Sequence, residues 1–209
     1  MTVLDDRHQD LERHPELRLV PRRPEIDLCA AEDSVRGLLT ALGADLSAEQ
    51  LRDTPRRAAQ AYAELLSPQE FNVTTFANED RYDELVVARG IPFHSLCAHH
   101  LLPFIGVAHV GYLPNGRILG LSKLARLVEA FARGLQTQEQ LTQQVANWMD
   151  EHLGARGVGV VLEAEHLCMS LRGVQAPGVK TVTSALHGLV RDDARTRQEF
   201  LALTGAGRA

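Results

Sequence analysis

Strand-like segments occupy only the second part of this chain, and they come in two pairs with two amphipathic helices between them. The helices are predicted at 122–135 and 141–153, where apolar side chains recur at helical spacing, and Ser122 is expected to cap the first. A last helix is predicted at 192–204. Strands that flank a helical pair predict an α+β fold. The four strand-like segments are short and rich in β-branched or alternating apolar residues, and they are 82–89, 104–112, 157–167 and 180–190.

Two further helices are predicted ahead of the strands. Apolar positions recur at helical spacing from Asp27 until Gly43, and a second helix is predicted from Asp53-Thr54-Pro55 to about Leu66. A capping side chain before a proline in the first turn is typical of a helix start. Residues 1–25 mix charges with three prolines and show no period, which favours a mobile arm. The predicted organisation is an arm at 1–25, a helical lead-in at 26–70 and a larger catalytic domain at 71–209.

The charge and hydropathy of the chain exclude several classes of protein. A formal net charge of −5, with 23% charged and 44% hydrophobic residues, is typical of a globular protein and not of a polybasic nucleic-acid binder. No run of 18 apolar residues occurs, and the first residues lack the apolar stretch of a secretory signal. We therefore expect no nucleic-acid partner, no membrane partner and a cytoplasmic location. Three widely spaced cysteines favour reduced thiols over a disulfide framework.

Residues 93–104 read FHSLCAHHLLPF and place one cysteine and three histidines in an otherwise apolar segment. Cys97 and His100 have the spacing Cys-x-x-His, so both can reach one ion from a tight turn between strands. A lone buried cysteine can equally be a small apolar side chain. A third candidate ligand, Cys168, follows late in the third strand-like segment. Two thiolates and one imidazole would leave the fourth position of a zinc ion for water, as in catalytic sites.

Two more histidines accompany these candidate ligands. His99 lies inside the same motif, and His166 precedes Cys168 by two residues, the spacing of neighbours on one face of a strand. An unliganded imidazole titrates near neutral pH and is suited to proton transfer. The alternative is that both histidines are core residues or only support the ligands.

Together, four motifs in this chain resemble the GTP cyclohydrolase I family. The resemblance extends from about residue 54 to residue 204, and the motifs are CAHH at 97–100, GLSKLAR at 120–126, QEQLT at 138–142 and HLCMSLRG at 166–173. It implies the tunnelling fold, in which N-terminal helices precede an antiparallel sheet with a helical pair and sheets are joined between subunits. It also implies a homo-oligomer, usually a decamer, with sites between neighbouring chains.

The resemblance implies a reaction as well. Members of the family open the imidazole ring of GTP at C8, release formate and rearrange the ribose to give 7,8-dihydroneopterin triphosphate. By resemblance, Cys97, His100 and Cys168 hold Zn²⁺, which activates water for the ring opening. His166 then protonates the neighbouring N7, and His99 assists proton transfer.

The resemblance also assigns residues to the two ends of the substrate. A triphosphate needs cations and backbone donors in fixed positions. Glu139 is expected to accept the N1–H and 2-amino donors of guanine, with Gln138 assisting at the base, although a glutamate in a first helical turn is also favoured by the helix dipole. Arg57 matches a family arginine that reaches the phosphate site of a neighbouring chain. The residues expected at the triphosphate are Ser122, Lys123, Arg126 and Arg172, any one of which could instead be a solvated surface residue.

Two positions depart from the family pattern. Ala98 stands where the family usually has glutamate, and Gln140 where it usually has arginine. Losing both leaves the local charge unaltered, so we expect one coupled change rather than two independent ones. Three hypotheses remain open at this stage: an active cyclohydrolase, an enzyme that stops after ring opening and formate release, and a zinc- and nucleotide-binding relative without full turnover.

Overall fold

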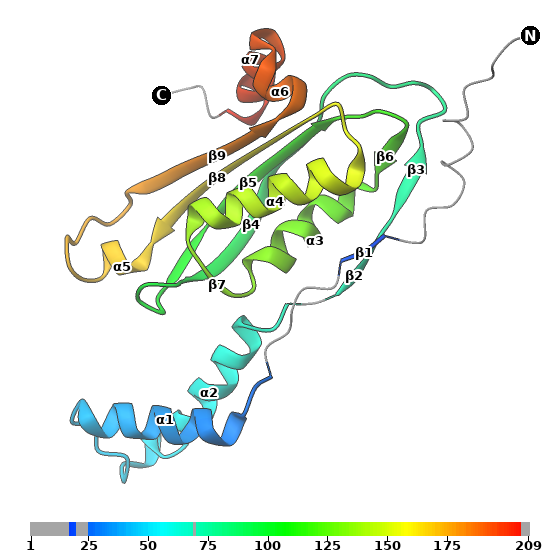
Figure 1. Ribbon diagram of the computed structural model, residues 1–209. Helices are drawn as coiled ribbons and strands as arrows, with labels where there is room; N and C mark the ends of the chain where they lie inside the picture. Colours follow the sequence, from blue (N-terminus) through cyan, green and yellow to red (C-terminus); the bar gives the residue numbers. More distant parts are fainter. Residues whose placement is uncertain (1–16, 20–24, 69, 206–209) are drawn as a thin grey trace, which may run out of the picture.

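The computed structural model describes residues 17–19, 25–68 and 70–205. It has a mixed α+β architecture, in which a five-stranded sheet carries two long helices on one face and further helices at its ends (Figure 1). The α+β prediction is therefore confirmed. No helix in the described ranges combines the length and the apolar character that a membrane span requires.

The two predicted N-terminal helices are present as α1 (Leu28–Ala41) and α2 (Thr54–Leu65), with a short 3₁₀ turn, η3 (Glu49–Leu51), between them. The carboxylate of Asp27 caps α1 by accepting the backbone N–H of Ala30 at 3.0 Å. Gly43 follows α1 with a φ of +84°, a backbone conformation that glycine adopts without steric cost. At α2 the expected cap is absent, because the carboxylate of Asp53 pairs instead with the guanidinium of Arg57 at 3.2 Å.

The main sheet has the strand order β7-β4-β5-β8-β9. All of its pairings are antiparallel except that of β7 with β4. The first predicted strand is shifted: it begins at Val86 rather than Tyr82 and continues through Cys97, so residues 93–97 of the FHSLCAHHLLPF segment belong to it. A bulge at Gly90, with a φ of +73°, divides it. The strands are β4 (Val86–Cys97), β5 (Pro103–Leu113), β7 (Leu135–Gln136), β8 (Gly157–His166) and β9 (Lys180–His187).

Two small sheets were not predicted. One pairs β1 (Leu17–Leu19) with β2 (Phe71–Val73), and the other pairs β3 (Thr75–Ala77) with β6 (Arg117–Leu119). The expected mobile arm at 1–25 lies largely outside the described residues, but its described segment is the strand β1.

The helical pair covers one face of the main sheet and consists of α3 (Leu121–Ala132) and α4 (Gln138–Leu153). Its apolar stripes form the main core with β4, β5 and β8. Two details differ from the predictions. Ser122 does not cap α3, because the helix begins one residue earlier after Gly120. Leu135 does not belong to the helical stripe, because α3 ends at Ala132 and the chain enters β7.

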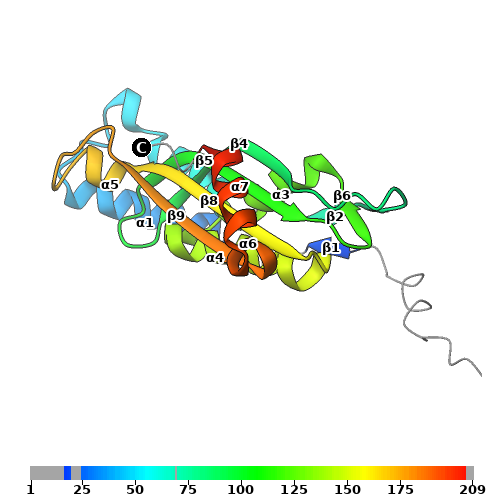
Figure 2. The same ribbon diagram turned by 90° about the horizontal axis from the view of Figure 1, so that it is seen from above.

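The opposite face of the sheet has a smaller apolar cluster at one end, beneath α6 (Gly188–Asp192) and α7 (Ala194–Thr204). Both helices lie against the strands in Figure 2. The ring of Phe200 is fully buried against Gly111 and Gly159. A Cβ atom at these glycines would lie 3.0 Å and 2.7 Å from that ring, so only glycine leaves room for it. This contact closes one end of the second face.

Candidate active site

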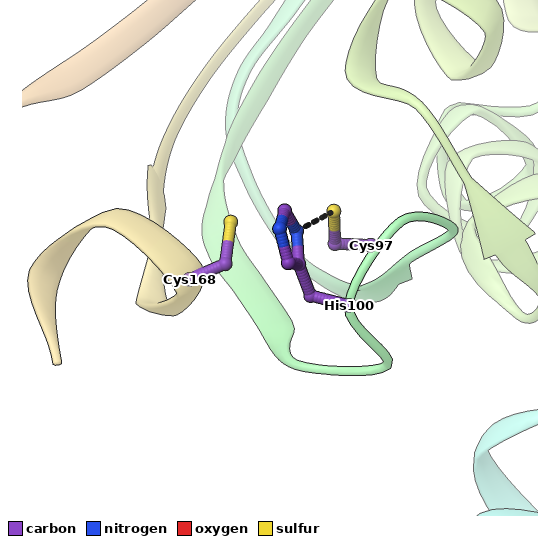
Figure 3. A group of neighbouring side chains, drawn as sticks. All are labelled: Cys97, His100 and Cys168. Atoms are coloured by element: carbon purple, nitrogen blue, oxygen red, sulfur yellow. Dashed lines mark hydrogen bonds between the residues drawn. The ribbon is translucent and has the colours of Figure 1, made fainter. Parts of the chain in front are cut away.

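Three side chains that can bind a metal converge where β4 ends and α5 (Leu167–Ser170) begins (Figure 3). Their ligand atoms, in Cys97, His100 and Cys168, all lie within 4.8 Å of one another. The sulfur of Cys97 is 3.6 Å from Nδ1 of His100. Both cysteines are buried, whereas His100 is exposed. One ion could therefore contact all three side chains and still face solvent.

A tight turn after β4 brings Cys97 and His100 together, as their spacing predicts. The carbonyl of Cys97 accepts the backbone N–H groups of His100 at 3.2 Å and of Leu101 at 2.9 Å. Leu101 has a φ of +57°, an unusual value for a residue with a side chain, which indicates that its surroundings hold the turn in place. One such contact comes from α2, where the hydroxyl of Tyr62 donates to the carbonyl of Leu101 at 3.3 Å.

The sequence suggested that Cys168 lies late in a strand, but the structure places it in α5. The strand β8 ends at His166, and a single helical turn then brings the thiol of Cys168 to the cluster. Burial raises the pKa of the Cys168 thiol, and the neighbouring Cys97 raises it further. A divalent cation would reverse this effect by favouring the thiolates. Two thiols and an imidazole at this separation fit the ligand preference of zinc.

The two additional histidines lie beside the cluster. Nδ1 of His99 is 3.9 Å from the sulfur of Cys97, and the side chain is exposed. The ring of His166 stacks on Phe104, with centroids 4.7 Å apart and planes 3° from parallel. Burial lowers the pKa of His166, and the negative charge of Glu139 opposes this shift. The fold therefore places two imidazoles, one exposed and one stacked on an aromatic ring, next to the candidate ligands.

Gln138 is almost fully buried at the start of α4, with 1% of its surface exposed. Its Oε1 lies 2.8 Å from Nε2 of His166. Its Nε2 donates to the carbonyls of Thr181 and Leu162 at 2.9 Å and 3.2 Å and to the hydroxyl of Thr183 at 3.2 Å. This side chain is directed into the protein, and its closest functional neighbour is His166.

Glu139 and Arg172 are exposed near the same cluster. Glu139 lies in the first turn of α4, as predicted, and its charge acts on His166. Arg172 follows α5, and its positive charge acts on Cys168. Both side chains are free to reach a molecule bound at the candidate metal site.

The remaining predicted substrate residues do not lie at this cluster within one chain. Ser122 and Lys123 are at the beginning of α3, whereas the end of α3 leads into β7, which pairs with Cys97. Ten helical residues separate Ser122 from the end of α3, a distance of roughly 15 Å. Arg126 lines a groove of about 470 Å³ between α3 and β4. Arg57 is 68% exposed on α2 and pairs with Asp53.

Sequence reasoning missed two residues of this site. Phe104, which fixes the plane of His166, is within the quoted FHSLCAHHLLPF segment, and its register opposite His166 in the β5–β8 pair gives the contact. Only the correct pairing of the strands could have revealed it. Tyr62, which supports the turn, is separated from Leu101 by 39 residues and has no local sequence signal.

The fold and the site define this chain as an α+β protein in which three side chains that could hold a metal ion lie beside two further histidines. Comparison with known proteins agrees. A family model described as GTP cyclohydrolase I matches residues 31–205. GTP cyclohydrolase 1 of Streptomyces avermitilis is 52% identical over 186 residues, which cover 86% of this chain and 91% of that protein. GTP cyclohydrolase 1 of Aquifex aeolicus is 47% identical over 178 residues, which cover 85% of this chain and 97% of that protein. The chain belongs to the GTP cyclohydrolase I family.

Proposed function

We propose that the cluster of Cys97, His100 and Cys168 is the zinc site of an active GTP cyclohydrolase I. The reaction opens the imidazole ring of GTP at C8, releases formate and rearranges the ribose to give 7,8-dihydroneopterin triphosphate. The observation that supports it most is the convergence of three metal-binding side chains with two further imidazoles, in a chain 52% identical to a GTP cyclohydrolase 1. A relative that only bound nucleotide would not need these proton-transfer groups.

The residues of the site divide the chemistry of ring opening among them. Bound zinc supplies Lewis acidity, which lowers the pKa of water to about 7. His166 donates a proton to N7 of the guanine, which withdraws electrons from C8 and favours the addition of water there. Its stacking on Phe104 keeps the imidazole in one plane during this transfer. His99, exposed beside Cys97, moves protons between the site and solvent.

Glu139 provides the recognition of guanine in this proposal. Its carboxylate is exposed at the first turn of α4, and a carboxylate can accept the parallel N1–H and 2-amino donors of the base in one plane. Gln138 contributes at the base indirectly, through its contact with His166. Arg172 follows α5, close enough for its charge to act on Cys168, and attracts the triphosphate.

The complete site is shared between chains of a homo-oligomer, in the family's usual form a decamer. Within the described residues, β4 pairs with β7 only at Leu96 and Cys97, and β9 pairs only with β8, so both sheet edges offer unpaired backbone groups. Joining β9 of one chain to β4 of the next extends the sheet between subunits. Such an assembly brings phosphate-binding residues of a neighbouring chain to each metal site, and these are Ser122, Lys123, Arg126 and Arg57.

Mixing two inactive variants tests whether the site is shared. Lys123→Ala and Cys168→Ser chains are each expected to be nearly inactive alone, because one lacks a phosphate cation and the other a metal ligand. Dissociating and reassembling them together should restore activity, since some sites then combine an intact Lys123 with an intact Cys168. A matched mixture of Lys123→Ala with Arg126→Ala should restore far less, because both residues lie on the same helix. No recovery in the first mixture would place Lys123 in the same site as its own Cys168.

The reaction itself is tested by incubating the zinc-loaded protein with GTP and measuring formate and pterin fluorescence separately. We expect both products in equal amounts. Formate without pterin would identify an enzyme that stops after ring opening. Neither product, despite GTP binding, would favour a nucleotide-binding relative.

A further inference from the structure

The amide of Gln138 can adopt only one orientation. Its Nε2 faces the carbonyl oxygens of Leu162 and Thr181, which accept hydrogen bonds and cannot donate them. Reversing the amide would place Oε1 against these two oxygens, in a position where the side chain is 1% exposed and water cannot compensate. The third neighbour of Nε2 is the hydroxyl of Thr183, which also contacts the hydroxyl of Thr142 at 2.6 Å, so each of these polar groups has a partner within the protein. Oε1 is therefore the atom directed at His166.

This orientation determines which ring nitrogen of His166 holds a hydrogen. Oε1 of Gln138 is an acceptor, and it lies 2.8 Å from Nε2 of His166, so Nε2 must donate. The other nitrogen, Nδ1, has no hydrogen-bond partner among the described residues. Nδ1 is nevertheless accessible to solvent. In the described ranges, the sole side-chain nitrogen or oxygen that is both buried and without a partner is Oε1 of Gln136, so the unpartnered Nδ1 of His166 is not buried. The ring thus has one nitrogen bonded to the protein and one that solvent, or a bound substrate, can reach.

We propose that Gln138 is a positioning residue that holds His166 as the Nε2–H tautomer, so that every proton His166 exchanges with the substrate passes through Nδ1. The proposal deepens the role of His166 and rests on the proposed function of this site. In the opposite tautomer Nε2 would be the basic nitrogen, facing the buried amide, where no substrate atom can reach it. Phe104 fixes the plane of the ring and Gln138 fixes its hydrogen, so the two restraints are independent. The contribution of Gln138 to catalysis is therefore made without touching GTP.

Neutron diffraction from deuterated crystals of the zinc-loaded wild-type protein locates these hydrogens directly. We expect a deuteron on Nε2 of His166 pointing at Oε1 of Gln138, and both amide deuterons of Gln138 pointing at acceptors. A bare Nε2, or a reversed Gln138 amide, overturns the proposal. This result does not depend on activity. If His166→Ala remained active, the proposed proton transfer by His166 would be wrong. The tautomer in the wild-type protein would still be decided by the neutron structure alone.

Kinetics of a nearly isosteric variant supply the functional test. Gln138→Met removes the acceptor at similar volume, so kcat should fall about 10- to 100-fold, the range found when a metal-binding imidazole loses the partner that orients it. The KM for GTP and the zinc content should stay near wild type. The matched control is Thr142→Val, which disturbs the same buried network without touching His166, and it should leave kcat unchanged. Equal losses of kcat in the two variants, or a raised KM with unchanged kcat, contradict the positioning role.

Discussion

Cys97→Ser, His100→Ala and Cys168→Ser are each expected to lose bound zinc and to reduce kcat by roughly 10³-fold or more, because three protein ligands leave no redundancy. The two buried thiols are adjacent, and each loss removes a ligand that could neutralise part of the charge of the ion. Metal analysis of the purified variants, together with the formate assay, measures both effects.

The matched control for the metal prediction is the remaining cysteine. Cys29 is exposed on α1 and is not a member of the cluster, so Cys29→Ser should keep about one zinc per chain and wild-type activity. Full zinc occupancy in all three ligand variants would contradict the site. Loss of zinc without loss of activity would instead assign the metal a structural role.

GTP is expected to exceed ATP in kcat/KM by about 10⁴-fold, the discrimination available to a site whose acceptor is covered by the bound base and left unpaired by the wrong one. Adenine lacks the N1–H and 2-amino donors that Glu139 accepts, so the carboxylate would be desolvated without a partner. Glu139→Ala should remove most of this preference while the zinc content stays unchanged. Competition binding with GTP and ATP measures the difference without requiring turnover.

A second glutamate on the same helix controls for the general effect of charge. Glu151 is exposed near the end of α4, and Glu151→Ala removes the same charge far from the start of the helix. It should leave the preference for GTP intact. If ATP competed equally with GTP for the wild-type protein, Glu139 would not be the residue that recognises guanine.

Capping residues, glycines and short motif spacings in the sequence predicted the helices and turns that depend on interactions between near neighbours in the chain. The span of α1 follows from Asp27 and Gly43, and the turn that joins Cys97 to His100 follows from their spacing. The start of β4 at Val86 was not predictable in this way, because the bulge at Gly90 and the packing of the strand under the helices decide it.

The site was predicted less completely, for reasons of tertiary structure. Cys168, the third candidate ligand, does lie with the other two, but it was predicted in a strand and lies in a helix, since a single helical turn after β8 has too few residues to show a period. The stacking of His166 on Phe104 depends on the register of two strands about 60 residues apart in sequence, and no local signal gives that register. The separation of Lys123 from the candidate metal ligands is set by the direction of α3, which the sequence also does not reveal. The expectation that Ala98 and Gln140 changed together stays a prediction.

The packing of Phe200 against Gly111 and Gly159 can form only late in the synthesis of the chain. Every strand of the main sheet precedes Phe200 along the chain, so the ribosome releases all of them before the ring that covers their second face. Until Phe200 packs there, Leu113 and Val161 leave an apolar surface exposed to solvent. Exposed apolar surface makes incomplete chains prone to aggregation, so we expect a chaperone that covers this face to protect them during that interval.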